Sequence, residues 1–74
     1  MMNPKFPRMS SAEAVRILHE HGFIDDRQRG SHLILFHPIK NKHVSVPVGR
    51  KDLPIGTTRS IFRDAEISLE DILT

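Results

Sequence analysis

The chain has 74 residues, of which 38% are hydrophobic and 27% charged, and this composition predicts one small globular domain and excludes a two-domain enzyme. It contains no cysteine, which excludes a disulfide scaffold and any zinc or iron–sulfur site with cysteine ligands. The longest apolar run covers residues 33–36, so we expect no membrane span, no signal peptide and a cytoplasmic protein.

The net charge of +2 is unevenly distributed along the chain. Residues 64–74 carry four acidic side chains and no Lys or Arg, whereas residues 1–63 carry all eleven Lys and Arg against five acidic residues. A basic body favours a polyanionic partner such as a nucleic acid. A solvated surface with scattered charge is the alternative that charge alone leaves open.

The first elements expected are a leader and a helix. Residues 1–9 contain two prolines and no apolar period, which predicts a flexible leader, and residues 10–74 then form a single domain. Ser10 and Glu13 have the spacing of a capping box, and apolar residues recur at helical spacing up to His21. Gly22 follows, and a glycine readily adopts the left-handed backbone conformation that ends a helix, so we expect a helix over 11–21.

Three strands are expected next, over 23–29, 32–37 and 43–48. Gly30-Ser31 is a two-residue turn signal, and residues 38–41 form a second turn. Valines alternate with polar residues in the third strand, so one face of the sheet should be covered by helices. Pro47 cannot donate to a ladder and favours an edge strand or a strand end.

The remainder predicts a loop over 52–56, a helix capped by Thr57 or Thr58, and a short last helix capped by Ser68. Ile61, Phe62 and Ala65 would form the buried stripe of the longer helix. The expected fold class is α+β: a two-layer sandwich with both main helices on one face of an antiparallel meander, in the order α-β-β-β-α with a short C-terminal helix.

The five histidines are the side chains that titrate near neutral pH without a special environment. Their spacing does not predict a metal site, and no cofactor is expected. His21 is interpreted as a partner of the helix dipole, and His37 and His43 as exposed hairpin residues. Asp25 and Asp26 should face opposite ways along their strand, solvated, and so form no acid–base pair.

His32 differs because it follows Arg27, Arg29 and Ser31 across a short turn. Cleavage of RNA requires a base for the 2′-OH proton and cations for the charged phosphorane, which an imidazole and two guanidinium groups can supply. A simple hydrogen-bonding role at the strand start is the alternative from spacing alone. Lys51 and Arg59 could add a phosphate-binding edge or form only a solvated face. Phe is the only one of Phe, Tyr and Trp in the chain, so few aromatic side chains are present on which bases could stack.

Several segments, in unbroken order over about residues 9–73, together resemble the HicA toxin family. They are Ser10-Ser11, His21-Gly22-Phe23, Arg29-Gly30-Ser31-His32, Val46-Pro47-Val48, Asp52-Leu53-Pro54-Ile55-Gly56-Thr57 and Arg59-Ser60-Ile61.

The resemblance implies a fold like the double-stranded RNA-binding domain and a metal-independent messenger-RNA endoribonuclease, the toxin of a type II toxin–antitoxin pair. The family's catalytic histidine carries over to His32. The implied partners are RNA and a HicB-like antitoxin, which covers the active site and, as a complex, binds operator DNA. Arg27, Arg29, Ser31, Lys51 and Arg59 are the expected RNA-binding residues.

Two positions depart from the family pattern. Gly49 stands where many relatives carry a histidine, which favours a mechanism with one histidine or transfers the second role to His43. Glu66 stands where many relatives have a glycine after the second helix, so that helix could end differently. A non-catalytic RNA-binding module on the same fold is the runner-up function, and a small protein-interaction domain is the third.

Overall fold

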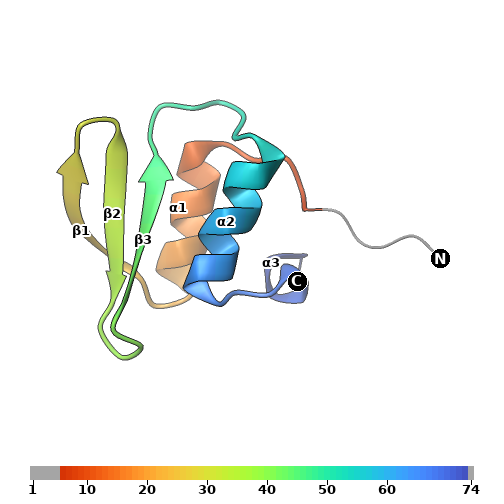
Figure 1. The fold of residues 1–74 in the computed structure, drawn as a ribbon. Helices are drawn as coiled ribbons and strands as arrows, with labels where there is room; N and C mark the ends of the chain where they lie inside the picture. The colour runs from red at the N-terminus through yellow and green to blue at the C-terminus, as the bar shows by residue number, and fades with distance from the viewer. Residues whose placement is uncertain (1–5, 74) are drawn as a thin grey trace.

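The computed structural model describes residues 6–73 of the chain. Three helices and three strands follow one another as expected (Figure 1), and the α+β class and the α-β-β-β-α order are confirmed. The elements are α1 (Ser11–Glu20), β1 (Ile24–Arg29), β2 (His32–His37), β3 (Lys42–Pro47), α2 (Ile55–Ala65) and α3 (Leu69–Leu73).

Helix α1 begins at the capping box that the sequence predicts. The Glu13 N–H donates to Ser10 Oγ at 3.1 Å, and the Ser10 N–H donates back to the Glu13 carboxylate at 3.2 Å. His21 ends the helix, where its Nδ1–H donates to the carbonyl of Ile17 at 2.9 Å, as expected for a histidine at the carbonyl end of a helix. Gly22 then turns the chain with a φ of +93°.

The strands form one antiparallel sheet in the order β1-β2-β3, with Gly30 and Ser31 as the turn between β1 and β2. Since side chains alternate between the two faces, Leu35, Val44 and Val46 lie on the core face and are buried. The opposite side of the sheet is called here the open face. It carries His32, Ile34 and Phe36 of β2 together with their partners on β3 and β1. Pro47 ends the edge strand β3, as expected.

Helix α2 starts earlier than the predicted threonine caps. It begins at Ile55 after Pro54, and no side chain caps its first turn. Thr58 is instead fully buried inside the helix, where its Oγ1–H donates to the Pro54 carbonyl at 3.2 Å. The prediction of a threonine cap is therefore wrong, because Pro54 presets the helix entry. At the other end Glu66 takes the left-handed conformation, with φ +60°, that a glycine usually supplies.

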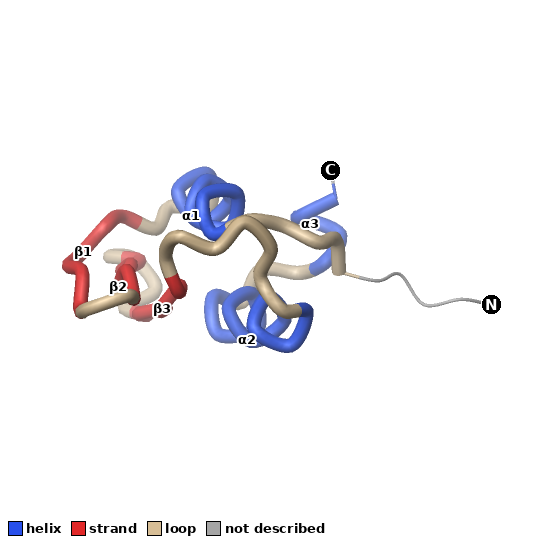
Figure 2. The backbone as a smooth tube through the Cα atoms, turned by 90° about the horizontal axis from the view of Figure 1, so that it is seen from above, coloured by secondary structure: helices blue, strands red, loops and turns tan. Residues whose placement is uncertain are grey.

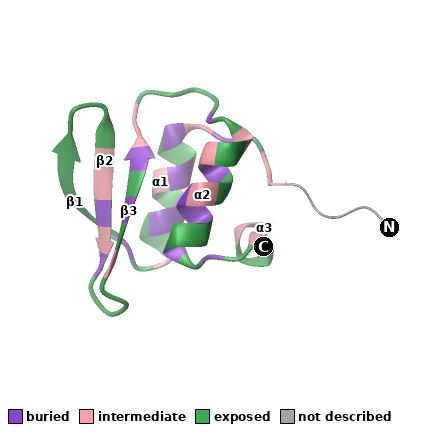
Figure 3. Ribbon diagram, in the orientation of Figure 1, coloured by how far each residue is buried: buried purple, intermediate pink, exposed green. Residues whose placement is uncertain are grey.

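The core lies between the sheet and the helices. Phe23, Leu35, Val46, Leu18, Leu53 and Phe62 are its largest fully buried apolar residues. Figure 2 shows α1 and α2 on either side of β3, so α2 lies over the edge of the sheet and borders residues of both faces. Strand β1 is exposed along its whole length (Figure 3). Within residues 6–73, no helix is long and apolar enough to cross a membrane.

Two expectations require correction. Residues 1–5 of the expected leader lie outside the described residues, but Met9 is buried in the core and Phe6 stacks on Phe62 at 6.4 Å between ring centroids. The Phe6 ring thus packs on Phe62 of α2, a contact between distant residues that the absence of a local period could not reveal. His37 is not exposed but 8% accessible, because its ring packs edge-on against Phe23 at 5.0 Å.

Candidate functional site

His32 is the first residue of β2 and lies on the open face of the sheet. Its backbone pairs with Arg29 across the two-residue turn and with Pro47 on β3, so the tight turn and the ladder fix its position. The residue is exposed, and Ser31 Oγ lies 3.5 Å from its Nδ1, at the outer limit of a hydrogen bond. The imidazole is therefore accessible to a ligand.

A shallow hollow of about 450 Å³ opens between His32 and helix α2. Its lining consists of His32, Ser45 and Pro47 from the sheet and Gly56, Thr57, Ser60, Ile61 and Asp64 from α2. The start of α2 has no side-chain cap, so the free N–H groups of its first turn give this end of the hollow a partial positive charge. Asp64 at the other end carries the opposite charge.

The polar side chains of α2 and β3 in this hollow are not among the site residues that the sequence predicts. Thr57, Ser60 and Asp64 recur at a spacing of three and four residues, which places them on one stripe of α2. Ser45 faces the same side of the sheet as His32, because it pairs with Ile34 two residues further along β2. Those periods were readable in the sequence, but the packing of α2 against β3 was not.

The structure places Arg27 and Arg29 on the same face as His32. Arg29 is paired with His32 and Arg27 with Ile34, and both arginines are exposed. Among the described residues, neither guanidinium has a carboxylate within ion-pair distance. Two uncompensated positive charges thus flank the imidazole on the β1 side.

The other three expected RNA-binding residues lie at different distances from His32. Ser31 is the adjacent turn residue, and Lys51 is an exposed residue of the loop after β3. This loop leaves β3 at the same end of the sheet as the β1–β2 turn (Figure 1). Arg59 lies on another side of α2 from the hollow, with its guanidinium 5.8 Å from the centre of the Phe6 ring. The structure does not bring Arg59 together with His32.

The loop that carries Lys51 is anchored to the start of α1. Ser11, which is buried, donates through Oγ to the Pro47 carbonyl at 2.5 Å and accepts from the Arg50 N–H at 3.0 Å. Arg8 forms an ion pair with Asp52, and its hydrogen bond lowers the pKa of the Asp52 carboxyl below the ordinary value. These contacts position the loop between β3 and α2.

Two other exposed histidines, His19 on α1 and His43 on β3, lie beside acidic side chains of β1. His19 Nε2 lies 2.7 Å from Asp25 and His43 Nε2 lies 3.6 Å from Asp26. A register shift between Asp25 and Arg27 interrupts the β1–β2 pairing at these acids, which reach α1 and β3 respectively. The expectation that Asp25 and Asp26 are only solvated is therefore corrected, because both carboxylates are partly exposed but each lies beside a histidine. In residues 6–73, no three His, Asp or Glu side chains cluster as a metal ion would require.

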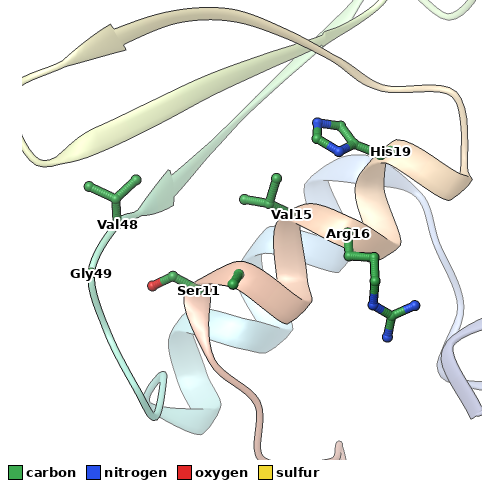
Figure 4. A pocket seen from close by; sticks show the side chains of 7 residues that line it. Ser11, Val15, Arg16, His19, Val48 and Gly49 are labelled. Atoms are coloured by element: carbon green, nitrogen blue, oxygen red, sulfur yellow. The ribbon is translucent and has the colours of Figure 1, made fainter.

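A second hollow lies on the α1 side of the molecule (Figure 4). It is lined by Ser11, Ala12, Val15, Arg16, His19, Val48 and Gly49. The hydroxyl of Ser11 is already engaged by backbone groups and His19 is paired with Asp25, so this hollow offers little free chemistry. Gly49 borders this hollow and not the one beside His32.

Comparison with known proteins identifies the family of this chain. A search of the curated proteins finds no similar protein. The family described as "HicA toxin of bacterial toxin-antitoxin" matches residues 11–67, a segment from the start of α1 to just beyond α2 that includes His32 and the whole hollow beside it. Since this match covers more than half of the chain, the protein belongs to the HicA toxin family of bacterial toxin–antitoxin systems.

Proposed function

We propose that this toxin is a metal-independent endoribonuclease that cleaves messenger RNA in the cytoplasm, with His32 as its catalytic residue. The observation that carries the proposal is the position of an exposed imidazole at a polar hollow beside two guanidinium groups that have no acidic partner among the described residues. Membership of a toxin family supports a target whose loss arrests growth.

The proposed reaction uses the RNA's own nucleophile. His32 takes the proton of a 2′-OH, the 2′ oxygen attacks the neighbouring phosphorus, and the bond from phosphorus to the 5′ oxygen breaks. The products are a 2′,3′-cyclic phosphate and a 5′-OH, which takes its proton from the imidazolium or from water. Arg27 and Arg29 would stabilise the negative charge that develops on the phosphorane.

Gly56 and Thr57, in the uncapped first turn of α2, line the same hollow, and the positive end of the helix dipole favours an anion there, which suits a bound phosphate. Ser31, in the β1–β2 turn, and Lys51, in the loop that leaves β3 at the same end of the sheet, are proposed to hold the flanking phosphates. Arg59, which lies outside the hollow, would contact RNA farther along the strand.

A mechanism with one histidine fits the distances. His43 pairs with Phe36 and His32 pairs with Pro47, four residues apart on the ladder. At roughly 3.3 Å per residue this separates the two histidines by about 13 Å, too far for both to act on one phosphate. Proton transfer to and from the reacting oxygens is therefore assigned to His32.

The antitoxin is proposed to be a small HicB-like protein that covers the hollow at His32 and so blocks access of RNA. Binding of operator DNA would belong to the toxin–antitoxin complex and not to the toxin alone. The basic open face also favours a second candidate function, a non-catalytic RNA-binding module.

The test compares the wild-type protein, freed of any partner, with His32→Ala and with His19→Ala as the matched control. His19 is also an exposed histidine, but it lies on α1 beside the other hollow. With a messenger RNA in EDTA, we expect cleavage to 2′,3′-cyclic phosphate ends by the wild type and by His19→Ala. We expect a loss of at least about 100-fold in His32→Ala.

Circular dichroism should show that all three proteins are equally folded, because His32 is exposed. Expression of each variant without antitoxin should arrest growth only where cleavage persists. Binding of RNA without cleavage by the folded wild type would refute the ribonuclease and support the RNA-binding module.

A further inference from the structure

A pair of rings stands on the open face of the sheet, at the end opposite to His32. The Phe36 ring of β2 and the His43 ring of β3 are cross-strand partners with centroids 4.6 Å apart and planes inclined by 35°. Phe36 is half-buried, and 54% of the His43 side chain is exposed. The core does not use these rings, because they lie on the face opposite to Leu35 and Val44.

On the open face, apolar side chains lie beside the two rings, and basic side chains lie farther along the sheet toward His32. Ile34 is half-buried, and Ile24, the β1 partner of Phe36, is 54% exposed. Arg27 and Arg29 continue the same face toward His32. Aromatic faces with neighbouring cations suit a single-stranded nucleic acid, whose bases stack and whose phosphates are negatively charged.

We infer that Phe36 and His43 form a stacking subsite for an unpaired base of the RNA that is cleaved at His32. This inference rests on the proposed ribonuclease function and adds its substrate class: a single-stranded segment laid along β2 and β3. A base inside a duplex is already stacked on its neighbours and cannot stack on these rings, so an A-form duplex leaves the subsite empty.

The distance along the strand sets which nucleotide reaches the rings. Phe36 lies four residues from His32 on β2, about 13 Å away at roughly 3.3 Å per residue. Stacked bases rise about 3.4 Å each, and an extended strand covers about twice that distance per nucleotide. The stacked base therefore belongs to a nucleotide about two to four positions from the cleaved bond.

Asp26 is the acidic group on this side of the subsite. Its carboxylate lies 3.6 Å from His43 Nε2, so its charge is next to the edge atom of the imidazole, and 54% of the His43 side chain remains exposed. The phosphates would follow the arginines of β1 nearer to His32, where the described residues place no ion-pairing carboxylate. The distribution of charge thus favours an RNA base at the two rings and the RNA phosphates beside the arginines of β1.

The experiment measures binding and cleavage separately. The binding probe is a short single-stranded RNA with 2′-O-methyl groups, which has no nucleophile for cleavage, and with 2-aminopurine as the reporter base. Phe36→Leu keeps an apolar side chain for the sheet but removes the aromatic face, and His43→Ala removes the exposed ring. Ile39→Ala is the control, since Ile39 is 90% exposed at the tip of the β2–β3 hairpin.

We expect quenching of 2-aminopurine by the wild type and by Ile39→Ala. In Phe36→Leu and in His43→Ala the quenching should disappear and the probe should bind roughly 5- to 150-fold more weakly, the range that base–aromatic stacking covers. Binding of a fully paired duplex should not change. With cleavable RNA the loss should appear in KM, while kcat and its pH profile stay as in the wild type, because the rings position the strand and transfer no proton.

Unchanged probe binding and quenching in both variants would overturn the stacking subsite, even if His32→Ala still abolishes cleavage. Weaker binding of the antitoxin with normal binding of RNA would overturn it too, since the face would then belong to a protein partner. Stacking that depends on Phe36, in a protein that cleaves no RNA, would support the subsite and refute only the ribonuclease.

Discussion

Replacement of Gly22 by alanine tests how the end of α1 closes against the β2–β3 hairpin. Gly22 has a φ of +93°, and a Cβ at this position would lie 2.7 Å from Nε2 of His37. The imidazole cannot easily move away, because its Nδ1 accepts the Lys40 N–H at 3.1 Å and its ring packs edge-on against Phe23. Gly22→Ala therefore combines backbone strain with overpacking of a buried ring.

The two costs can be estimated separately. A left-handed conformation costs a non-glycine residue about 1–2 kcal/mol, and overpacking adds typically about 1–3 kcal/mol. The expected loss is about 2–5 kcal/mol of unfolding free energy, a large share of the roughly 5–15 kcal/mol that keeps a domain folded. Gly30→Ala is the matched control, since Gly30 has a φ of +57° and no atom within 4 Å of an added Cβ. It should lose only about 1–2 kcal/mol.

Urea unfolding followed by far-ultraviolet circular dichroism measures both losses, and a thermal scan should show a fall of about 4–8 °C per kcal/mol. If Gly22→Ala is no less stable than Gly30→Ala, then His37 does not restrict a side chain at residue 22. A second variant, Gly22→Ala with His37→Ala, removes the ring and should lose less than the two single substitutions added together.

Three further predictions concern the loop and the basic face. Ser11→Ala should destabilise the protein by about 1–3 kcal/mol in urea, because two backbone groups of the loop after β3 lose their partner. The hydrogen bond from Arg8 lowers the pKa of the Asp52 carboxyl. The pair therefore stabilises the folded protein at pH values above the unfolded pKa of about 3.9, and this stabilisation is lost as the pH falls through the folded pKa. In Asp52→Asn the urea midpoint should therefore vary less with pH in this acidic range. Arg29→Ala should weaken binding of single-stranded RNA and reduce the slope of log K against log salt by about 0.7, as one lost phosphate contact requires; an unchanged slope would remove Arg29 from the RNA interface.

Local signals predicted most elements of the fold. The capping box at Ser10 and Glu13, the turn at Gly30 and the alternation of Val44 with Val46 each depend on neighbouring residues, and each is present in the structure. The start of α2 was misplaced because threonines offer a side-chain cap, whereas the chain uses the fixed φ of Pro54 and buries Thr58.

Long-range packing decided what the sequence pattern could not. His37 reads as a hairpin residue before a proline, but the turn at Gly22 brings Phe23 against its ring. The segment around Phe6 shows neither helical nor strand periodicity, yet the Phe6 ring stacks on Phe62. In each case the partner lies at least fourteen residues away in sequence, beyond any local period.

The candidate site divides in the same way. The local pattern of residues predicts a histidine that opens a strand directly after a tight turn, with two arginines on the preceding strand, because strand alternation and a two-residue turn fix which side chains share a face. The packing of α2 against β3 was needed to show that Ser60 and Asp64 border that histidine and that Arg59 does not, and the strand register was needed to show that Phe36 and His43 meet across the sheet. Helix periodicity gives a stripe of side chains but not the strand against which the stripe packs, and that choice depends on burial of the whole core.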